Sequence, residues 1–347
     1  MVSLPRLYLG SMTFGWEQAS TAVTQQVASS MVRTFKDSGG IMVDTARIYS
    51  GGACEAMVNE ACKDVDGLVV GTKAHPSQRS ESDSGLSLPG LESQFGTSAK
   101  HLSDCFPLSE YYLHQPDHES DLLTSLKYVD GLIKDGKVKK LGLSNYHVEE
   151  VKRCFELCDE HNLNPPTVYQ GLMNPLNRMV EDELLPLLRE HSCSFVAYNP
   201  LAAGLLTGKH TSETEVMEGR FKNNANYLPR FYTPGNFRAI SLIRSACEAA
   251  NITMVEGTYM WLLRHSALGE NDGLLIGASS MEQLESNLRA CEKAKEGEGL
   301  PEEVKIAFEQ AWGITKEESP FKYWRAFSKD MPGGTDMDQG EAYAVKK

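Results

Sequence analysis

The sequence predicts a single (β/α)8 barrel, the TIM-barrel class, in which eight parallel strands close into a ring and helices alternate with them. Short runs rich in apolar and β-branched residues recur eight times, and amphipathic stretches with helical spacing separate them. Runs such as Gly273-Leu-Leu-Ile-Gly277 are continuously apolar, as in a parallel sheet that is buried on both faces. No linker divides the chain into halves, so one closed barrel is favoured.

The strands and helices are expected in alternation along the chain. The predicted strands are Leu7–Gly10, Ile41–Asp44, Leu68–Lys73, Tyr111–His114, Val138–Ser144, Thr167–Gln170, Ser194–Asn199 and Leu274–Gly277. The helical stretches are 22–37, 53–63, 120–134, 147–160, 181–191, 237–264 and 281–293, and another helix resumes near Leu91. A two-domain doubly wound enzyme is the alternative fold. That fold requires a Gly-x-Gly-x-x-Gly turn, and Gly10-Ser-Met-Thr-Phe-Gly15 has a different spacing.

Three segments depart from the repeat. Residues 74–89 are rich in Ser, Gly and Pro, which predicts a loop. Residues 207–236 predict a long functional loop after the seventh strand, with short helical patches. From residue 328 the chain is polar and Gly-rich, which predicts a mobile C-terminal extension. We therefore expect a barrel domain at 1–327 and a tail at 328–347.

The composition is that of a globular protein with a large core. Hydrophobic residues make up 41% of the chain and charged residues 23%, so disorder is not expected. The formal charge of -13 argues against nucleic acid and anionic membrane surfaces as partners. No signal peptide and no long apolar run are found, which predicts a cytoplasmic protein. The sequence is also compatible with a homodimer. No Cys-x-x-Cys pair occurs, and Cys154 and Cys158 lack further ligands, so no metal site is predicted.

Polar side chains come at the ends of three neighbouring predicted strands. Asp44 ends the second strand and is followed by Tyr49, Lys73 ends the third, and His114 ends the fourth. The carboxyl ends of parallel strands meet at one mouth of a barrel, so we expect these four side chains to lie together. A lysine that ends a buried apolar strand needs a compensating charge, and Asp44 is the natural partner for Lys73.

Chemically, the four groups make a proton donor with the groups that tune it. An isolated phenol has a pKa near about 10, which is high for an acid at neutral pH, and a nearby ammonium favours the phenolate. Asp44 would orient Lys73, while His114 would donate to the substrate oxygen. Taken singly, each residue is more often structural, and only their shared placement favours catalysis. The other histidines, including His75 and His118, fall mostly in predicted loops or helices and are interpreted as structural or solvated.

The motifs at these positions resemble those of the aldo-keto reductase superfamily over about residues 6–325. They are Asp44-Thr-Ala-x-x-Tyr49, Gly71-Thr-Lys73, Tyr-Leu-His114-x-Pro-Asp117 and Gly142-Leu-Ser144-Asn145. The resemblance implies a TIM barrel in which Asp44, Tyr49, Lys73 and His114 are the catalytic tetrad and Tyr49 is the general acid for carbonyl reduction. It also implies NADPH that is bound without a Rossmann turn. The residues that it assigns to the nicotinamide are Ser144, Asn145, Gln170 and, stacked on the ring, Tyr198.

The same resemblance assigns two further runs to the other end of NADPH. Residues 200–209 would wrap the pyrophosphate, with Lys209 adding charge. Ala203–Lys209 nearly matches a P-loop, but Ala203 replaces its first glycine and His210 its Ser or Thr. The helix after the last strand offers N–H groups to an anion, although on its own a Ser N-cap is the simpler interpretation. The cofactor residues of these runs are Asn199, Pro200, Leu201, Gly204, Leu206, Gly208, Lys209, Ala278, Ser279, Ser280, Gln283 and Asn287.

Within the superfamily, the chain most resembles the aflatoxin aldehyde reductase branch, through Val168-Tyr-Gln-Gly171, Gly219-Arg-Phe221 and Met281-Glu-Gln-Leu-Glu-Ser-Asn-Leu288. The resemblance implies that Arg220 lies near the 2′-phosphate, which favours NADPH over NADH. Paired hydrogen bonds from an arginine suit a carboxylate, whereas an exposed arginine is more often only solvated. The loop before Arg230 is shorter than in the branch, and 22 residues follow Arg325. The substrate residues implied are His114, Tyr227, Arg230 and Arg325.

The sequence thus predicts NADPH-dependent reduction of aldehydes, reactive ketones or dicarbonyls to alcohols, with carboxylated aldehydes favoured. An NADPH-binding redox sensor that acts through a protein partner is the alternative from another class, because an intact tetrad is compatible with it. A sugar-phosphate isomerase on the same barrel is the least favoured, because it leaves Ser144, Asn145 and Tyr198 unexplained. The physiological substrate is not determined by the sequence.

Overall fold

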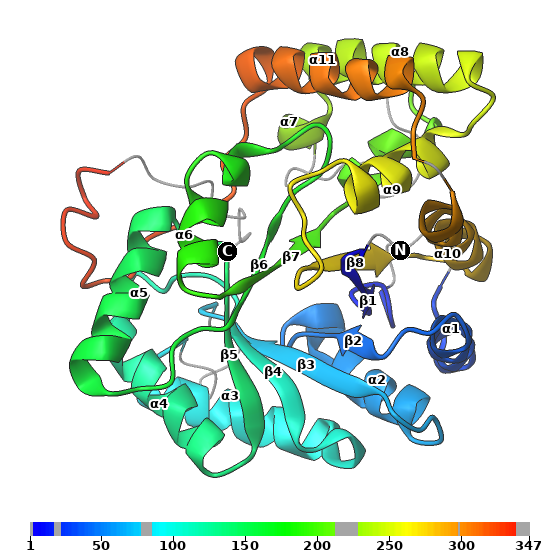
Figure 1. Ribbon diagram of the computed structural model, residues 1–347. Helices are drawn as coiled ribbons and strands as arrows, with labels where there is room; N and C mark the ends of the chain where they lie inside the picture. Colours follow the sequence, from blue (N-terminus) through cyan, green and yellow to red (C-terminus); the bar gives the residue numbers. More distant parts are fainter. Residues whose placement is uncertain (1–2, 17–21, 78–84, 212–227, 298, 338–347) are drawn as a thin grey trace.

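Eight parallel strands close into a barrel in the computed structural model, which describes residues 3–16, 22–77, 85–211, 228–297 and 299–337 (Figure 1). The strands follow chain order, and β8 pairs with β1 to close the ring, which confirms the predicted (β/α)8 class. The strands are β1 (Arg6–Gly10), β2 (Met42–Asp44), β3 (Val69–Ala74), β4 (Leu108–Leu113), β5 (Val138–Ser144), β6 (Val168–Leu172), β7 (Ser194–Tyr198) and β8 (Gly273–Gly277).

Helices surround this ring. The longer ones are α1 (Gln25–Asp37), α2 (Cys54–Cys62), α3 (Leu88–His101), α4 (Leu122–Lys134), α5 (Val148–His161), α6 (Leu184–Glu190), α8 (Pro234–Ala249), α9 (Met254–Arg264), α10 (Met281–Glu296) and α11 (Glu302–Glu318). The shorter ones are η1 (Tyr49–Gly52), η2 (Ser103–Cys105), η3 (Met179–Glu181), η4 (Ala202–Thr207) and α7 (Leu228–Phe231). None of the helices within the described residues is long and apolar enough to cross a membrane.

Helix α11 was not among the predicted helices, and two other departures from the predicted helices have a local sequence explanation. The single helix expected over 237–264 is two helices, because Asn251 adopts a left-handed φ of 55° and Thr253 then starts α9. Thr253 forms a capping box with Glu256, in which each side chain satisfies the other residue's backbone N–H. Helix α3 begins inside the segment expected to be a loop, because Ser87 caps it and a proline is favourable in a first turn.

Alternation along the strands decides which side chains enter the barrel. Residues two apart on a strand share a face, so Tyr112 points inward like the strand-end residue His114 that follows it. Tyr8, Met42, Tyr112, Val168 and Val196 form an interior cluster that is separate from the main hydrophobic core. Two glycines make room for its rings: a Cβ on Gly142 would lie 2.3 Å from the Tyr112 ring, and one on Gly273 would lie 2.5 Å from that of Tyr8.

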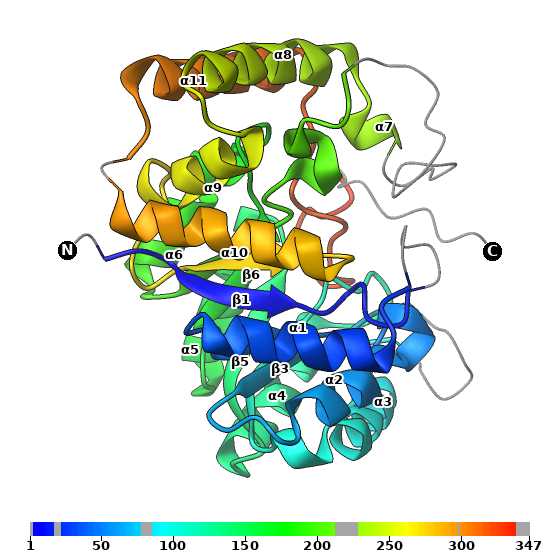
Figure 2. The ribbon, with the colours of Figure 1, turned by 90° about the vertical axis from the view of Figure 1, so that its right-hand side faces the viewer.

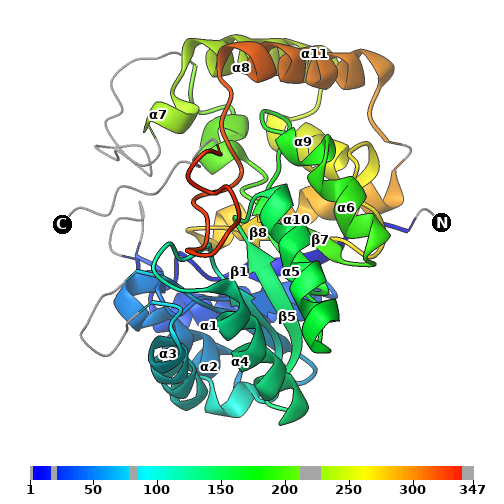
Figure 3. The same ribbon diagram turned by 90° about the vertical axis from the view of Figure 1, so that its left-hand side faces the viewer.

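The chain beyond the barrel returns across its carboxyl end. Helices α8 and α11 lie side by side outside the ring (Figure 2), and the segment after α11 then passes beside β5 and the start of α4 (Figure 3). Arg325 N donates to Asn145 O at 3.0 Å, Ser328 N to Glu150 at 2.9 Å, and Leu122 N to Asp330 at 2.9 Å. Residues 328–337 thus contact the barrel, residues 338–347 lie outside the described part, and the domain boundary at 327 and the mobility of the tail stay predictions.

Candidate active site

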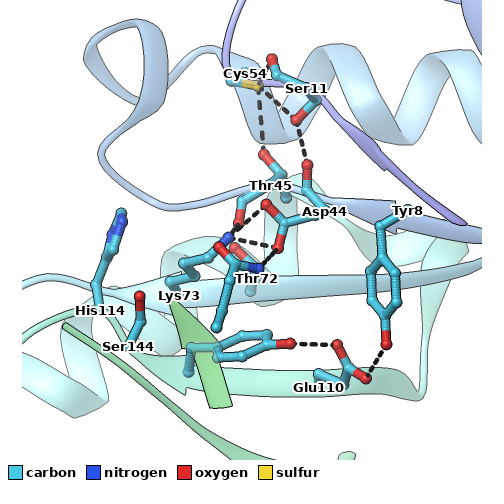
Figure 4. Close-up of polar contacts among 12 residues, drawn as sticks. Tyr8, Ser11, Asp44, Thr45, Cys54, Thr72, Lys73, Glu110, His114 and Ser144 are labelled. Carbon is cyan, nitrogen blue, oxygen red and sulfur yellow. Dashed lines mark hydrogen bonds and ion pairs between the residues drawn. The ribbon is translucent and has the colours of Figure 1, made fainter. Parts of the chain in front are cut away.

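A buried ion pair occupies the mouth of the barrel between β2 and β3. Lys73 Nζ contacts Asp44 Oδ1 at 2.5 Å and Oδ2 at 2.6 Å, and donates to Thr45 O at 2.8 Å (Figure 4). Both side chains are almost fully enclosed, at 0% and 3% exposure. Each charge compensates the other, and the carbonyl of Thr45 takes a further ammonium proton, so the pair meets the condition for burying charge. The predicted pairing of Asp44 with Lys73 is therefore present in the structure.

Gln170 joins this pair from the opposite side of the ring. Its Nε2 donates to Asp44 Oδ1 at 2.9 Å, although the two residues are 126 positions apart in sequence. The prediction gave Gln170 to the nicotinamide carboxamide alone, and the contact with Asp44 was missed. Because Nε2 is taken by Asp44, the amide is oriented, and Oε1 has no hydrogen-bond partner among the described residues.

Tyr49 and His114 lie close to the Lys73–Asp44 ion pair. Tyr49 opens η1, whose tight path places Ser50 and Gly51 at φ of 50° and 65°, and Ser50 Oγ donates to Phe14 O at 2.6 Å. The Lys73 ammonium lies 5.5 Å from the centre of the Tyr49 ring. The Tyr49 and His114 ring centroids are 5.8 Å apart at an interplanar angle of 79°. The four predicted catalytic side chains therefore meet at one mouth, while their catalytic roles stay predictions.

His114 sits one residue past β4 and is held in the neutral state. Its backbone N–H donates to Ala74 O at 2.9 Å, which extends the β3–β4 pairing beyond the strand. Burial first, and then the electrostatic contributions of His75, Lys73 and Arg325, hold the pKa of His114 well below its usual range. A neutral imidazole that is still partly accessible at the mouth can donate one N–H to a bound oxygen.

The ends of β5 and β7 share a polar network. Asn145, in a left-handed conformation with φ of 63°, donates from Nδ2 to His114 O at 2.8 Å and to Ser144 Oγ at 3.0 Å. Tyr198 OH donates to Asn145 Oδ1 at 2.8 Å. Asn145 is therefore committed to the protein framework, whereas the Ser144 hydroxyl, as an acceptor of one bond, still has its own proton to donate.

The run after β7 forms a tight turn with an unusual backbone. Ala203, Gly204 and Gly208 have φ of 59°, 110° and 82°, and Asn199 Oδ1 accepts from Ala203 N at 2.6 Å. A Cβ on Gly204 would meet no atom of the described residues within 4 Å. Pro200, Leu201 and Leu206 belong to the same turn, and Lys209 at its end is exposed.

The start of α10 presents a preformed set of polar groups. Ser280 is the N-cap and accepts from Gln283 N at 3.3 Å, while Gln283 Oε1 accepts from both N and Oγ of Ser279, at 3.0 and 3.1 Å. Asn287 Nδ2 donates to Gly277 O at 3.1 Å, and Ala278 O accepts from Thr13 at 2.6 Å. The Ser cap that the sequence suggested is present, and it leaves α10 with an ordered N-terminus of the kind that suits an anion.

Two arginines near the mouth are buried and share one aromatic ring. Arg230 is 7% exposed and Arg325 is 1% exposed, and their Cζ atoms lie 3.6 and 5.6 Å from the centre of the Phe321 ring. Neither is the solvated surface arginine considered as the alternative, because both guanidinium groups are enclosed. Phe321 carried no sequence signal for this role. Arg220 and Tyr227, also predicted, lie outside the described residues.

Comparison with known proteins identifies the class. The Aldo/keto reductase family matches residues 6–300 of this chain. The aflatoxin B1 aldehyde reductase member 2 of Rattus norvegicus is 36% identical over 337 residues, which cover 92% of this chain and 88% of that protein. The human protein of the same name is 36% identical over 333 residues, covering 91% and 89%. An aldo-keto reductase of Pseudocercospora fijiensis is 36% identical over 298 residues, covering 82% and 97%.

The chain therefore belongs to the aldo/keto reductase family, and the fold, the site and these relatives agree. It is an oxidoreductase of that family, whose members generally use NAD(P)H.

Proposed function

We propose that this protein is an NADPH-dependent reductase that converts aldehydes and reactive ketones or dicarbonyls to alcohols, with Tyr49 as the general acid. The observation that carries the proposal is the buried Lys73–Asp44 pair beneath the Tyr49 ring, with neutral His114 at its edge. Relatives named as aflatoxin B1 aldehyde reductases support the substrate class.

The residues around the mouth fit a nicotinamide carboxamide. Gln170 Oε1 is an acceptor without a partner among the described residues, and the Ser144 hydroxyl still has a proton to donate. A primary amide offers one acceptor and two protons, so these two groups complement it. Asn145 would hold Ser144 and Tyr198 in place, with the Tyr198 ring as the stacking surface. The turn at 199–209 and the start of α10, with Ser279, Ser280, Gln283 and Asn287, would hold the phosphates and the adenosine.

Bound NADPH supplies the hydride, and the chain's own residues manage the proton. Tyr49 donates its hydroxyl proton to the carbonyl oxygen, which leaves a phenolate. The Lys73 ammonium near the Tyr49 ring favours that phenolate, and its bonds to Asp44 hold Lys73 in place. His114 donates an N–H to the same oxygen and so stabilises the charge that develops there.

The proposed preference for carboxylated aldehydes rests on the two buried arginines. A guanidinium pairs with a carboxylate through two parallel hydrogen bonds. Stacking on Phe321 holds Arg230 in one plane, so little side-chain freedom is lost when an anion binds.

The Tyr49→Phe variant tests the mechanism because it removes only the hydroxyl. Aldehyde-dependent NADPH oxidation should fall by about 10²–10⁴-fold, the usual contribution of a general acid, while NADPH binding measured by fluorescence stays unchanged. Turnover at the wild-type rate in this variant would contradict the role of Tyr49. Tight NADPH binding by the wild type without steady turnover on any aldehyde would instead support the redox-sensor alternative.

A substrate panel tests the preference. NADPH oxidation is measured with 2-carboxybenzaldehyde, succinic semialdehyde, neutral aldehydes and diketones, in the wild type and in Arg230→Ala and Arg325→Ala. We expect the KM for the carboxylated aldehydes to rise at least about tenfold in each variant, as for the loss of about 1.4 kcal/mol of binding, with neutral aldehydes little changed. Equal loss on neutral and carboxylated aldehydes would contradict carboxylate recognition.

A further inference from the structure

His75 lies against the His114 ring and is held there from two sides. It follows directly on β3, two residues after Lys73, and its ring centroid is 5.1 Å from that of His114 at an interplanar angle of 87°. The buried Gln94 of α3 holds its backbone: Gln94 Oε1 accepts from His75 N at 2.9 Å, and Gln94 Nε2 donates to His75 O at 3.1 Å. Gln94 also donates to Gly85 O at 2.8 Å, which ties this turn to the start of α3.

The ring of His75 is oriented as well. Its Nδ1 accepts a hydrogen bond from Ser77 N at 2.9 Å, so in the neutral form the proton is on Nε2. A ring whose backbone and one nitrogen are both fixed presents a constant surface to its neighbour. His114 therefore packs edge-to-face against a rigid partner.

His114 needs such a partner because no hydrogen bond from the described residues fixes its ring. Its Nδ1 is buried and has no hydrogen-bond partner within the described part of the chain. A histidine usually has its tautomer and orientation set by the bond that one ring nitrogen makes. Because Nδ1 is the enclosed nitrogen, Nε2 is the one that a substrate can reach.

Four side chains of the described residues contact the His114 ring or contribute to its electrostatic environment. Tyr49 comes from η1, Lys73 from β3, His75 from the turn after β3, and Arg325 from the segment after α11. Of these, His75 and Tyr49 contact the ring as aromatic neighbours. Tyr49 is the proposed proton donor, which leaves His75 as the neighbour that has no other task in the reaction.

We propose that His75 is a positioning residue for the reaction: its ring holds the His114 imidazole in the orientation in which Nε2–H points to the carbonyl oxygen. The inference rests on the proposed function, in which His114 donates to that oxygen. His75 does not itself touch the substrate. It also contributes, after burial, to holding the pKa of His114 below its usual range, together with Lys73 and Arg325.

Two variants separate the ring of His75 from its hydrogen bond. His75→Asn removes the ring, and its side-chain oxygen replaces Nδ1 as a local acceptor, whereas His75→Phe keeps a planar ring against His114. We expect kcat for aldehyde reduction to fall by about ten- to a hundredfold in His75→Asn, as for a misplaced catalytic group, and to recover most of that loss in His75→Phe. His118→Asn is the matched control, because His118 lies in the loop between β4 and α4 and its side chain is 79% exposed.

A direct readout at His114 keeps this test independent of turnover. Long-range ¹H–¹⁵N NMR of the imidazole should show one neutral tautomer, Nε2–H, in the wild type and a mixture of tautomers in His75→Asn. The pKa of His114 should rise in both His75 variants, because the electrostatic contribution of His75 that lowers it is removed, and stay unchanged in His118→Asn.

Unchanged kcat together with unchanged His114 spectra in His75→Asn would overturn the proposal. NADPH binding and thermal unfolding report whether each variant is folded, and a misfolded His75→Asn leaves His75→Phe to decide through the pKa of His114. If the wild type reduces no aldehyde, the proposed function fails, whereas the NMR comparison still shows whether His75 orients His114.

Discussion

Two carboxylates inside the barrel, Asp44 on β2 and Glu110 on β4, are buried in different ways. Asp44 contacts a full ammonium charge on Lys73 at 2.5 Å and an amide N–H of Gln170. Glu110 accepts from two phenols, Tyr112 at 2.6 Å and Tyr8 at 3.1 Å (Figure 4). Its nearest cation among the described residues, Lys140, is 3.8 Å away and 39% exposed. Burial raises the pKa of Glu110, and the phenols offset only part of this effect.

The comparison shows where the barrel keeps charge. Asp44 and Lys73 compensate each other at the mouth, so the ammonium that the chemistry needs is present beneath Tyr49. Lower in the barrel, none of the described residues pairs a cation with Glu110 as closely, and burial raises its pKa. The Tyr112 ring separates the two sites and lies 5.3 Å from the Lys73 ammonium. The barrel interior therefore contains a layer with a closely paired ion pair at the mouth and, deeper, a layer in which a buried carboxyl is held mainly by hydrogen bonds from phenols.

The largest expected effect comes from breaking the charged layer. Lys73→Met leaves Asp44 buried without its cation, which should cost about 3–5 kcal/mol in the free energy of unfolding. The double variant Asp44→Asn/Lys73→Met removes both charges, so it should recover part of that loss. Urea unfolding at pH 7 measures both, and aldehyde reduction should be lost in both.

Lys140→Met is the matched control for the lower layer. Lys140 is partly exposed and lies 3.8 Å from Glu110, so its removal should cost about 1 kcal/mol or less. If Lys73→Met is no more destabilising than Lys140→Met, the two layers do not differ as argued.

A smaller effect, dependent on pH, is expected at Glu150 of α5, a third buried carboxylate outside the barrel. It accepts from Ser328 N at 2.9 Å, and burial raises its pKa from 4.5 to about 7. An acid with a raised pKa in the folded state stabilises the fold fully below pH 4.5, and that stability is lost as the pH rises to about 7. Relative to the wild type, Glu150→Gln should therefore gain about 3 kcal/mol between pH 4.5 and pH 8.

Urea unfolding of both proteins across this pH range measures the gain. Glu149→Gln, at an exposed position in the same turn, should follow the wild type at every pH. A constant difference between Glu150→Gln and the wild type from pH 4.5 to pH 8 would show that Glu150 titrates as in the unfolded chain.

Much of this arrangement could be predicted from the sequence, because it depends on local periodicity. The strand runs and helical spacings predicted the closed barrel, and the strand-end positions predicted that Asp44, Lys73 and His114 meet. The division of α8 from α9 also had a local signal, the Thr253-x-x-Glu256 capping box, which was not used in predicting the helix over 237–264.

Contacts that depend on ring closure were not predictable in this way. Gln170 reaches Asp44 over 126 positions and Tyr8 reaches Glu110 over 102, and no local pattern records either separation. Arg230 and Arg325 both lie against Phe321, which the chain supplies only after α11. His75 was interpreted as structural or solvated because its link to the site is a ring contact with His114, which strand spacing does not reveal.

The smallest expected effect tests whether the lower layer is separate from the chemistry. Tyr8→Phe removes the longer of the two phenol bonds to Glu110, so it should lower the free energy of unfolding by about 1 kcal/mol. Tyr112→Phe removes the shorter bond but keeps the ring beneath Lys73, so it should cost somewhat more while leaving kcat within about twofold of the wild type. Urea unfolding and aldehyde reduction are measured for both variants. A fall in kcat in Tyr8→Phe would mean that the protonation of Glu110 is felt at Lys73, and the interior would then be one coupled network rather than two layers.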